Sequence, residues 1–223
     1  NLLFRNVGGA FRVALGTGLQ TAAVGPSQAL FLDLDADGDR DLFFAGFNDL
    51  TASQLYENLG NGQFADVTDA SGTRGLRAFT ATAFDWDRDG RVDFLGSSTP
   101  LGAGLPGQGL FLMRNEGEGR FADVAREACL DPRVGLRNGE VRTLDHDGDG
   151  ILDLLMVSPD HLLLYRGSAD GRYFDVTREA GLVPVRPSAL VCEFRRRFGL
   201  DRCTNGASGT AVGDYDGDGD PDV

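Results

Sequence analysis

Hydrophobic residues occur along the chain in short runs that glycine and aspartate interrupt. Apolar runs such as "ALFL", "ATAF", "VRTL" and "TAVG" lead into acidic segments, and runs such as "LFFAGF", "VDFLG" and "LDLLMV" follow them. Strand-sized apolar runs separated by turn residues are typical of all-β proteins, and no sustained helical period is present. We therefore expect an all-β fold with more than about 40 % strand and less than about 10 % helix.

A first motif, D-x-D-x-D-G-x-x-D, occurs four times without a mismatch. Its copies begin at Asp33, Asp85, Asp145 and Asp214, so they are spaced by 52, 60 and 69 residues. An apolar run precedes each copy, and another follows each of the first three. The acidic motif is therefore expected in the turn between two strands.

A second motif runs in phase with the first. Its copies "LYENLGNGQFADVTDASG", "LMRNEGEGRFADVAREAC" and "LYRGSADGRYFDVTREAG" begin at Leu55, Leu112 and Leu164, and a shortened copy, "LFRNVGGAFRV", begins at Leu3. Each full copy predicts two strands joined by a tight turn, where glycine adopts the positive φ angles that the turn requires. After the second strand we expect one helical turn at most.

Together the two motifs predict four antiparallel strands in each repeat, which is the composition of a β-propeller blade. We expect a partial β-propeller of about four blades, forming a single repeat domain over residues 1–223 that is a fragment of a larger propeller. Its expected parts are a half-blade (2–24), three blades (about 28–72, 79–130 and 140–182), an insert (183–207) and the start of a further blade (208–223).

The acidic motif places like charges close together, which is unfavourable unless a cation lies among them. Ca²⁺ fits this composition, because it takes about six to eight oxygen ligands and accepts irregular geometry. Mg²⁺ prefers strict octahedral geometry, and Zn²⁺ prefers Cys and His ligands. In the third copy, the carboxylates of Asp145, Asp147, Asp149 and Asp153 and the backbone carbonyl of Ile151 are expected to surround one ion.

The equivalent positions of all four copies are the candidate ligands for up to four Ca²⁺ ions. They are Asp33, Asp35, Asp37, Asp39, Asp41, Asp85, Asp87, Asp89, Arg91 (through its backbone carbonyl), Asp93, Asp145, Asp147, Asp149, Ile151, Asp153, Asp214, Asp216, Asp218, Asp220 and Asp222.

An EF-hand is the first alternative, because its calcium loop opens with the same residues. That loop also needs a glutamate at position 12 and flanking helices. Position 12 is Phe44, Gly96 and Met156 in the first three copies, and the flanking segments predict strands, so the EF-hand is excluded. A set of solvated turns without an ion is the second alternative. Four copies in phase with a second motif argue against it.

The acidic loops, together with the "N-x-G-x-G-x-F-x-D-V-T" segments, resemble the FG-GAP/VCBS repeats of integrin α-subunit propellers. The resemblance covers almost the whole chain and is strongest to UnbV/ASPIC-type proteins and cartilage acidic protein. It implies a calcium-binding β-propeller, commonly seven-bladed, with the cation in the loop between the first two strands of a blade. The insert at 183–207, the shortened first copy and the small number of blades depart from that pattern.

The resemblance also implies a binding or adhesion module of an extracellular, cell-surface or periplasmic protein, with a protein or glycan as its partner. We expect no catalysis, because the chain has two histidines and neither belongs to a recognisable catalytic arrangement: His146 stands within an acidic motif and His161 in a predicted turn. The alternative is the propeller part of a calcium-dependent extracellular hydrolase or polysaccharide lyase.

The net charge of −13 is concentrated in the acidic motifs, which hold 18 of the 34 acidic residues. The rest of the chain carries 16 acidic residues against 18 arginines. These arginines are scattered, apart from Arg195, Arg196 and Arg197, so we expect no nucleic-acid partner. No apolar run approaches the roughly 20 residues of a membrane-spanning helix, so we expect no membrane insertion in this segment.

Two of the three cysteines, Cys192 and Cys203, lie in the insert and could form a disulfide that suits an oxidising compartment. Cys129 aligns with Gly72 and Gly181 of the other repeats. We expect it to stay reduced and to pack as a small apolar side chain.

Overall fold

The computed structural model describes residues 3–19, 26–48, 51–97, 109–131, 140–157, 162–182, 212–214, 216 and 219–221. These residues contain fourteen β-strands and no α-helix, and strands make up nearly half of them. The all-β class predicted from the spacing of apolar runs is thus confirmed for the described part of the chain.

The strands form three four-stranded antiparallel sheets and one two-stranded hairpin, and the strand order in every sheet follows the order in the chain. The hairpin consists of β1 (Leu3–Val7) and β2 (Ala10–Ala14). The first sheet consists of β3 (Gln28–Leu32), β4 (Asp41–Asn48), β5 (Thr51–Asn58) and β6 (Phe64–Asp66). The second consists of β7 (Thr80–Phe84), β8 (Asp93–Ser97), β9 (Leu110–Gly117) and β10 (Arg120–Asp123). The third consists of β11 (Glu140–Leu144), β12 (Asp153–Val157), β13 (Leu162–Gly167) and β14 (Tyr173–Asp175).

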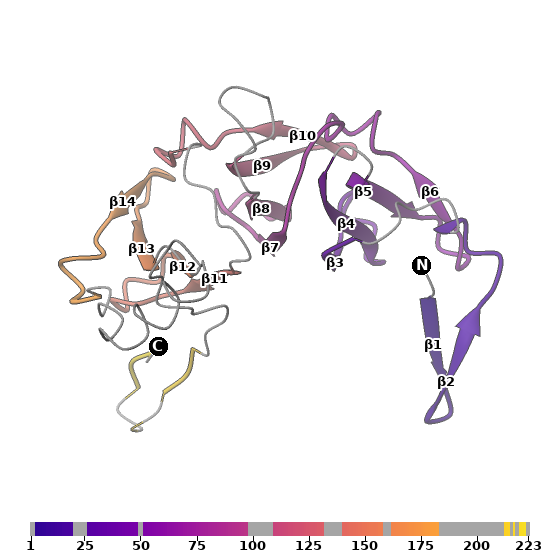
Figure 1. Cartoon of the computed structure of the whole chain (residues 1–223), viewed down its shortest axis with the longest axis horizontal. Coiled ribbons are helices and arrows are strands. Elements are labelled where there is room, and N and C mark those ends of the chain that lie inside the picture. The colour runs from indigo at the N-terminus through magenta and orange to yellow at the C-terminus, as the bar shows by residue number, and fades with distance from the viewer. Residues whose placement is uncertain are drawn as a thin grey trace, which may run out of the picture.

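The sheets stand side by side along an arc, with the β1–β2 hairpin at one end and the third sheet at the other (Figure 1). The first strands of the sheets, β3, β7 and β11, lie on the concave side, and β3 contacts β7 as β7 contacts β11. Radial meanders of four antiparallel strands are the blades of a β-propeller. The chain is therefore a partial propeller of about four blades, three of them whole in the described residues.

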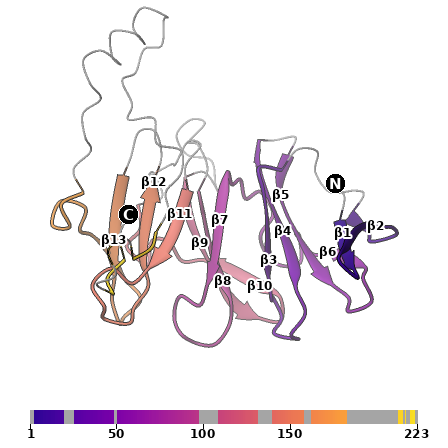
Figure 2. The ribbon, with the colours of Figure 1, turned by 90° about the horizontal axis from the view of Figure 1, so that it is seen from below.

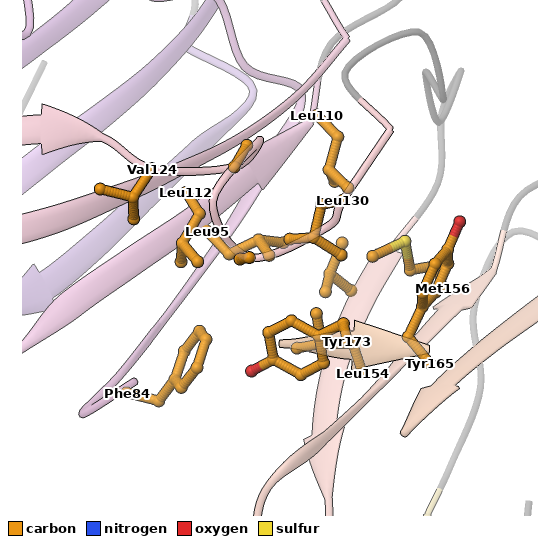
Figure 3. Packing of buried hydrophobic residues seen from close by; sticks show 13 residues of the cluster. Phe84, Leu95, Leu110, Leu112, Val124, Leu130, Leu154, Met156, Tyr165 and Tyr173 are labelled. Carbon is orange, nitrogen blue, oxygen red and sulfur yellow. The ribbon is translucent and has the colours of Figure 1, made fainter. Parts of the chain in front are cut away.

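Hydrophobic side chains fill the space between neighbouring sheets. One cluster joins the second and third sheets and includes Leu95, Leu112, Leu154 and Met156, all 0 % exposed (Figure 3). Another joins the first and second sheets through contacts between aromatic rings, one pair tilted and one edge to face. Because fully burying such a side chain stabilises the fold by roughly 1.5–3 kcal/mol, the contacts between blades hold the arc together.

The same backbone hydrogen bond connects each unit to the one before it. The amide groups of Phe64, Phe121 and Tyr173 donate to a carbonyl oxygen of the preceding unit at N–O distances of 2.8, 2.9 and 2.9 Å. These three residues align in the repeated second motif. The sequence repeat therefore corresponds to a repeat of contacts between blades as well as to a repeat of strands.

A single helical turn follows the last strand of each blade, closed by backbone bonds such as that from Ala128 N to Val124 O (2.9 Å). Cys129 lies at the end of this turn with a φ of 59°, as Gly72 and Gly181 do with 78° and 73°. The prediction that Cys129 packs as an apolar side chain was wrong, because its place in the turn leaves it exposed. It forms no disulfide with any described residue.

Cys192, Cys203 and the rest of the insert at 183–207 lie outside the described residues, so their predicted disulfide stays a prediction. The described strands and turns include no helix of the length and apolarity that crossing a bilayer would take.

Candidate metal centre

The first three acidic motifs form the loops that join the first two strands of each whole blade. These loops cover residues 33–40, 85–92 and 145–152, between β3 and β4, β7 and β8, and β11 and β12. The three loops lie along the same edge of the arc, at the bottom of Figure 2. This is the placement that the sequence predicted for them.

The aspartate that ends each acidic motif is completely buried at the start of the second strand. Asp41, Asp93 and Asp153 are each 0 % exposed. Each carboxylate accepts two backbone N–H bonds, one from position 2 of its own motif and one from the end part of the third strand. The donors are Leu34 and Asn58 for Asp41, Trp86 and Asn115 for Asp93, and His146 and Gly167 for Asp153, at N–O distances of 2.6–2.8 Å. This aspartate therefore fastens the loop to the blade.

Burial also makes the charge of these aspartates costly. It raises the pKa of Asp41 to about 6 and that of Asp93 to about 6. The two N–H donors lower each pKa but only partly offset the burial, and aspartates of the same loop raise it further. A raised pKa means that the folded protein disfavours the ionised carboxylate, so a cation in the loop would stabilise it near neutral pH.

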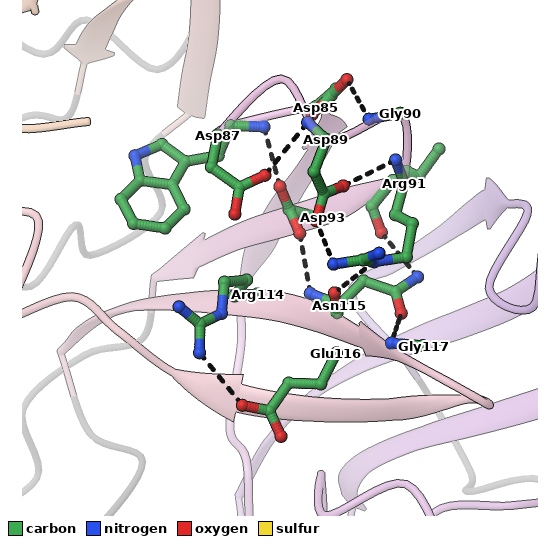
Figure 4. A network of polar contacts seen from close by, with 12 residues as sticks. Asp85, Asp87, Asp89, Gly90, Arg91, Asp93, Arg114, Asn115, Glu116 and Gly117 are labelled. Carbon is green, nitrogen blue, oxygen red and sulfur yellow. Dashed lines mark hydrogen bonds and ion pairs between the residues drawn. The ribbon is translucent and has the colours of Figure 1, made fainter. Parts of the chain in front are cut away.

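The aspartate at position 1 shapes the loop by accepting backbone N–H bonds from positions 5 and 6. In the second loop the carboxylate of Asp85 accepts from Asp89 at 3.1 Å and from Gly90 at 3.0 Å (Figure 4). The third loop repeats this pattern with Asp145, which accepts from Asp149 and Gly150. In the fourth copy Gly219 N donates to the carboxylate of Asp214 at 3.1 Å, which is the same spacing in the sequence.

Among the described residues, four groups of side chains have potential ligand atoms within 4.8 Å of one another. They are Asp33, Asp35 and Asp37; Asp85, Asp87 and Asp93; Asp145, Asp147 and Asp149; and His146, Asp147 and Asp153. The structure thus brings together most of the predicted ligands of the first three motifs. Among the other predicted carboxylate ligands that it describes, Asp39, Asp41, Asp89, Asp214, Asp216 and Asp220 join none of these groups. Asp218 and Asp222 lie outside the described residues.

The first loop holds two buried carboxylate oxygens, Asp33 Oδ1 and Asp39 Oδ1, that have no hydrogen-bond partner within the described chain. The pKa of Asp39 is raised by burial and by the charges of Asp37, Asp35 and Asp33. A buried polar atom without a partner is unfavourable, and a bound cation would satisfy both oxygens. Because the potential ligands of this loop are all hard oxygen atoms, its residues fit Ca²⁺.

Two side-chain roles in these loops were missed by the sequence analysis. Arg91, expected to contribute only its backbone carbonyl, pairs its guanidinium group with the carboxylate of Asp89 and donates from Nε to the carbonyl oxygen of Asn115 at 2.8 Å (Figure 4). His146, read as a variable position of the motif, contacts the carboxylate of Asp153 through Nδ1. The sequence pattern does not predict either contact, because both residues occupy positions that vary among the four copies of the motif.

The chain is similar to a protein family and to several solved structures. No curated protein sequence matches the chain. The structure of a lectin from Agrocybe aegerita, described as recognising non-reducing terminal N-acetylglucosamine, aligns with 22 % identity and a TM-score of 0.41. The alignment covers 66 % of this chain and 37 % of the lectin chain, so this chain spans well under half of that protein. At this TM-score nothing about the present chain follows from the likeness.

The family match falls on the acidic loops themselves. The FG-GAP-like repeat matches residues 33–96 and 145–223, which together make up more than half of the chain. The matched segments begin at the first residue of an acidic motif, at Asp33 and at Asp145. With its repeated blades, its acidic hairpin loops and this match, the chain belongs to the FG-GAP-like repeat family.

Proposed function

We propose that this chain is a calcium-binding β-propeller module of a secreted or cell-surface protein, and that it recognises a protein or glycan partner without catalysis. The observation that supports calcium most directly is the first loop, where two buried carboxylate oxygens lack a partner in the described chain. Asp33, Asp35, Asp37 and Asp39 would hold the ion there. In the third loop Asp145, Asp147 and Asp149 would do so.

The buried aspartate at position 9 fits the same role. A carboxylate oxygen has two lone pairs, so Asp153 can accept a backbone N–H with each oxygen and still offer a lone pair to a cation. Bound Ca²⁺ would supply positive charge to the loop. Hydrogen bonds within the chain already hold the loop to its blade. The proposed effect of the ion is therefore to stabilise the fold and to order the loop.

The proposal of recognition without catalysis is supported by the contacts of the acidic residues. The aspartates that are close enough to form acid–base pairs are engaged with backbone amides or grouped as potential ligands, and His146 contacts Asp153. His161 lies outside the described residues. The alternative remains the propeller part of a calcium-dependent extracellular hydrolase or polysaccharide lyase. We also propose that the chain is related most closely to UnbV/ASPIC-type proteins and cartilage acidic protein. Its proposed location is extracellular, on the cell surface or periplasmic.

The decisive experiment is calorimetric titration of the metal-free chain with Ca²⁺, followed by capture on glycan arrays and by protein pull-down, each with Ca²⁺ and with chelator. We expect Ca²⁺ binding with Kd about 10⁻⁴–10⁻³ M, the range of extracellular calcium modules. Capture should require Ca²⁺. Absence of Ca²⁺ binding at millimolar concentration would refute the proposal, and turnover of a polysaccharide on the array would favour the alternative.

The three loops should not bind Ca²⁺ equally, because Arg91 already places a positive charge beside Asp89 in the second loop. The equivalent position in the third loop is Ile151, which carries no charge. Arg91→Ile should therefore tighten Ca²⁺ binding by the second loop about tenfold, equivalent to ~1.4 kcal/mol. Ile151→Arg should weaken binding by the third loop by a similar factor. Calorimetric titration of both variants measures these changes.

The pair of variants forms its own control, because each places in one loop the residue that the other loop has naturally. The double variant Arg91→Ile, Ile151→Arg should bind as many ions as the wild type, with the affinities of the two loops exchanged. Equal Ca²⁺ affinities in the wild type and both single variants would show that Arg91 does not compete with the cation.

A further inference from the structure

The junction between the second and third blades holds a cavity of about 230 Å³. One side is formed by Trp86 and Arg88 of the second acidic loop. The other is formed by the third blade, with Gly167 at the end of β13, Gly171 in the β13–β14 turn and Tyr173 at the start of β14. The cavity therefore lies between two blades, beside the edge that carries the acidic loops.

Four of the residues that line the cavity differ from the residues at the equivalent positions of the other repeats. The departures are Trp86 in place of Leu34 and His146, Arg88 in place of Ala36 and Gly148, Gly167 in place of Asn58 and Asn115, and Tyr173 in place of Phe64 and Phe121. The strand order is the same in all three blades, so it does not require the changes at Trp86, Arg88 and Tyr173. They converge on one cavity, which indicates a function that is local to this junction.

Gly167 lines the cavity where the other two blades have an asparagine. At the preceding junction the equivalent residue, Asn115, fills the gap between two loops, because its Nδ2 donates to the carbonyl oxygens of Leu34 (2.8 Å) and Val92 (3.3 Å). Gly167 has no such side chain. A Cβ atom there would lie 2.6 Å from the carbonyl oxygen of Leu152, so the close approach of the third loop excludes a side chain from this position.

Trp86 forms a fixed wall of the cavity. Its Nε1 donates to the carbonyl oxygen of Gly171 at 3.0 Å, and its ring packs on that glycine so closely that a Cβ atom there would lie 3.0 Å from Cζ2. The side chain thus bridges two blades and has little freedom to move. A held aromatic side chain offers apolar contact area without an ordering cost on binding.

Two polar groups at the cavity have no partner within the described part of the chain. Tyr173 is 4 % exposed, and its hydroxyl, directed toward Phe84 in Figure 3, makes no hydrogen bond there. Arg88 is exposed, makes no ion pair or hydrogen bond with a described residue, and has a φ of 61°, a conformation that is strained for a residue with a side chain.

We propose that this cavity is a subsite for one neutral sugar ring of a glycan, an inference that rests on the proposed binding function. A sugar has apolar C–H faces and many hydroxyl groups, which suit an aromatic wall beside the Tyr173 hydroxyl and the Arg88 guanidinium. The volume corresponds to about eight water molecules at ~30 Å³ each, so it accommodates a single ring. The carboxylate of Asp85 also lines the cavity and disfavours an anionic ligand.

Trp86 is the only tryptophan of the chain, so its fluorescence reports on this cavity alone. The full chain in Ca²⁺ is titrated with glucose, galactose, mannose, N-acetylglucosamine and, as an anion, glucuronate. At least one neutral sugar should give a saturable change with Kd about 1–10 mM, as expected for so small a ligand. Tyr173→Phe and Arg88→Ala should each raise this Kd at least fivefold. Both variants install the residue of another blade, Phe121 and Ala36, so folding is expected to be preserved.

The control is Arg120→Ala, which removes an exposed arginine from β10 and should leave the Kd unchanged. No saturable change with any neutral sugar up to 100 mM would overturn the inference, as would an equal Kd in the wild type and both cavity variants, or preferential binding of glucuronate. Calcium stoichiometry and partner capture measured on the same sample separate this failure from failure of the proposed function. Ca²⁺-dependent capture of a protein with no response to sugars would reject the sugar subsite alone.

Discussion

Asp153→Ala should lower the free energy of unfolding by about 2–5 kcal/mol even when no Ca²⁺ is present. The carboxylate of Asp153 is 0 % exposed and accepts backbone N–H bonds from His146 (2.8 Å) and Gly167 (2.7 Å). Its removal leaves two buried donors without a partner, each at a cost of about 1–3 kcal/mol. Urea unfolding in chelator measures the change, and in Ca²⁺ the third loop should also lose its ion.

The matched control is Asp147→Ala in the same loop. Asp147 is exposed, and its carboxylate accepts only an exposed N–H from Asp149 at 3.3 Å. In chelator this variant should unfold within about 0.5 kcal/mol of the wild type, the usual range for a surface substitution. In Ca²⁺ it too should lose the third ion. If Asp153→Ala proves as stable as Asp147→Ala in chelator, the aspartate at position 9 is a ligand only and does not hold the loop to the blade.

The strand architecture could be predicted because each blade repeats the same pattern of apolar runs and turns. The two motifs were in phase, so the pairing of strands and the place of the acidic loops followed from order along the chain. Phe64, Phe121 and Tyr173, which align in the repeat, also make equivalent hydrogen bonds to the preceding unit, although no contact between blades was predicted from their alignment. Local rules suffice here because a blade contacts mainly its neighbours.

The side chains that vary between repeats could not be interpreted in this way. Arg91 pairs with Asp89 within its own loop, and Trp86 bonds to a residue 85 positions away in the next blade. Neither contact follows from the motif, because the motif fixes only the positions that all copies share. Cys129 shows the same limit, since its alignment with glycines indicated an unusual backbone but not that the side chain would be exposed.

Calcium removal should destabilise the whole module by several kcal/mol. At about 1 mM Ca²⁺ and a Kd of about 0.1 mM, each site contributes RT ln(1 + 10), or ~1.4 kcal/mol. Four such sites would contribute roughly 5–6 kcal/mol, comparable with the net stability of a small domain. Four divalent ions would also change the net charge from −13 to −5, which relieves much of the repulsion within the loops. For a chain of this size we expect the melting temperature to fall by about 10–20 °C in chelator.

The loss of stability on calcium removal should differ among the blades. Hydrogen exchange in chelator measures this difference for each strand. The β3–β4 hairpin should open first, because the first loop holds Asp33 and Asp39 oxygens that have no other partner within the described chain. The β7–β8 hairpin should be protected longest, since Arg91 compensates the charge of Asp89 without an ion. Arg91→Ile should remove this protection while Ile151→Arg confers it on β11–β12. A melting temperature that chelator leaves unchanged, or equal protection of all three hairpins, would contradict a calcium-stabilised propeller in which each blade responds through its own loop.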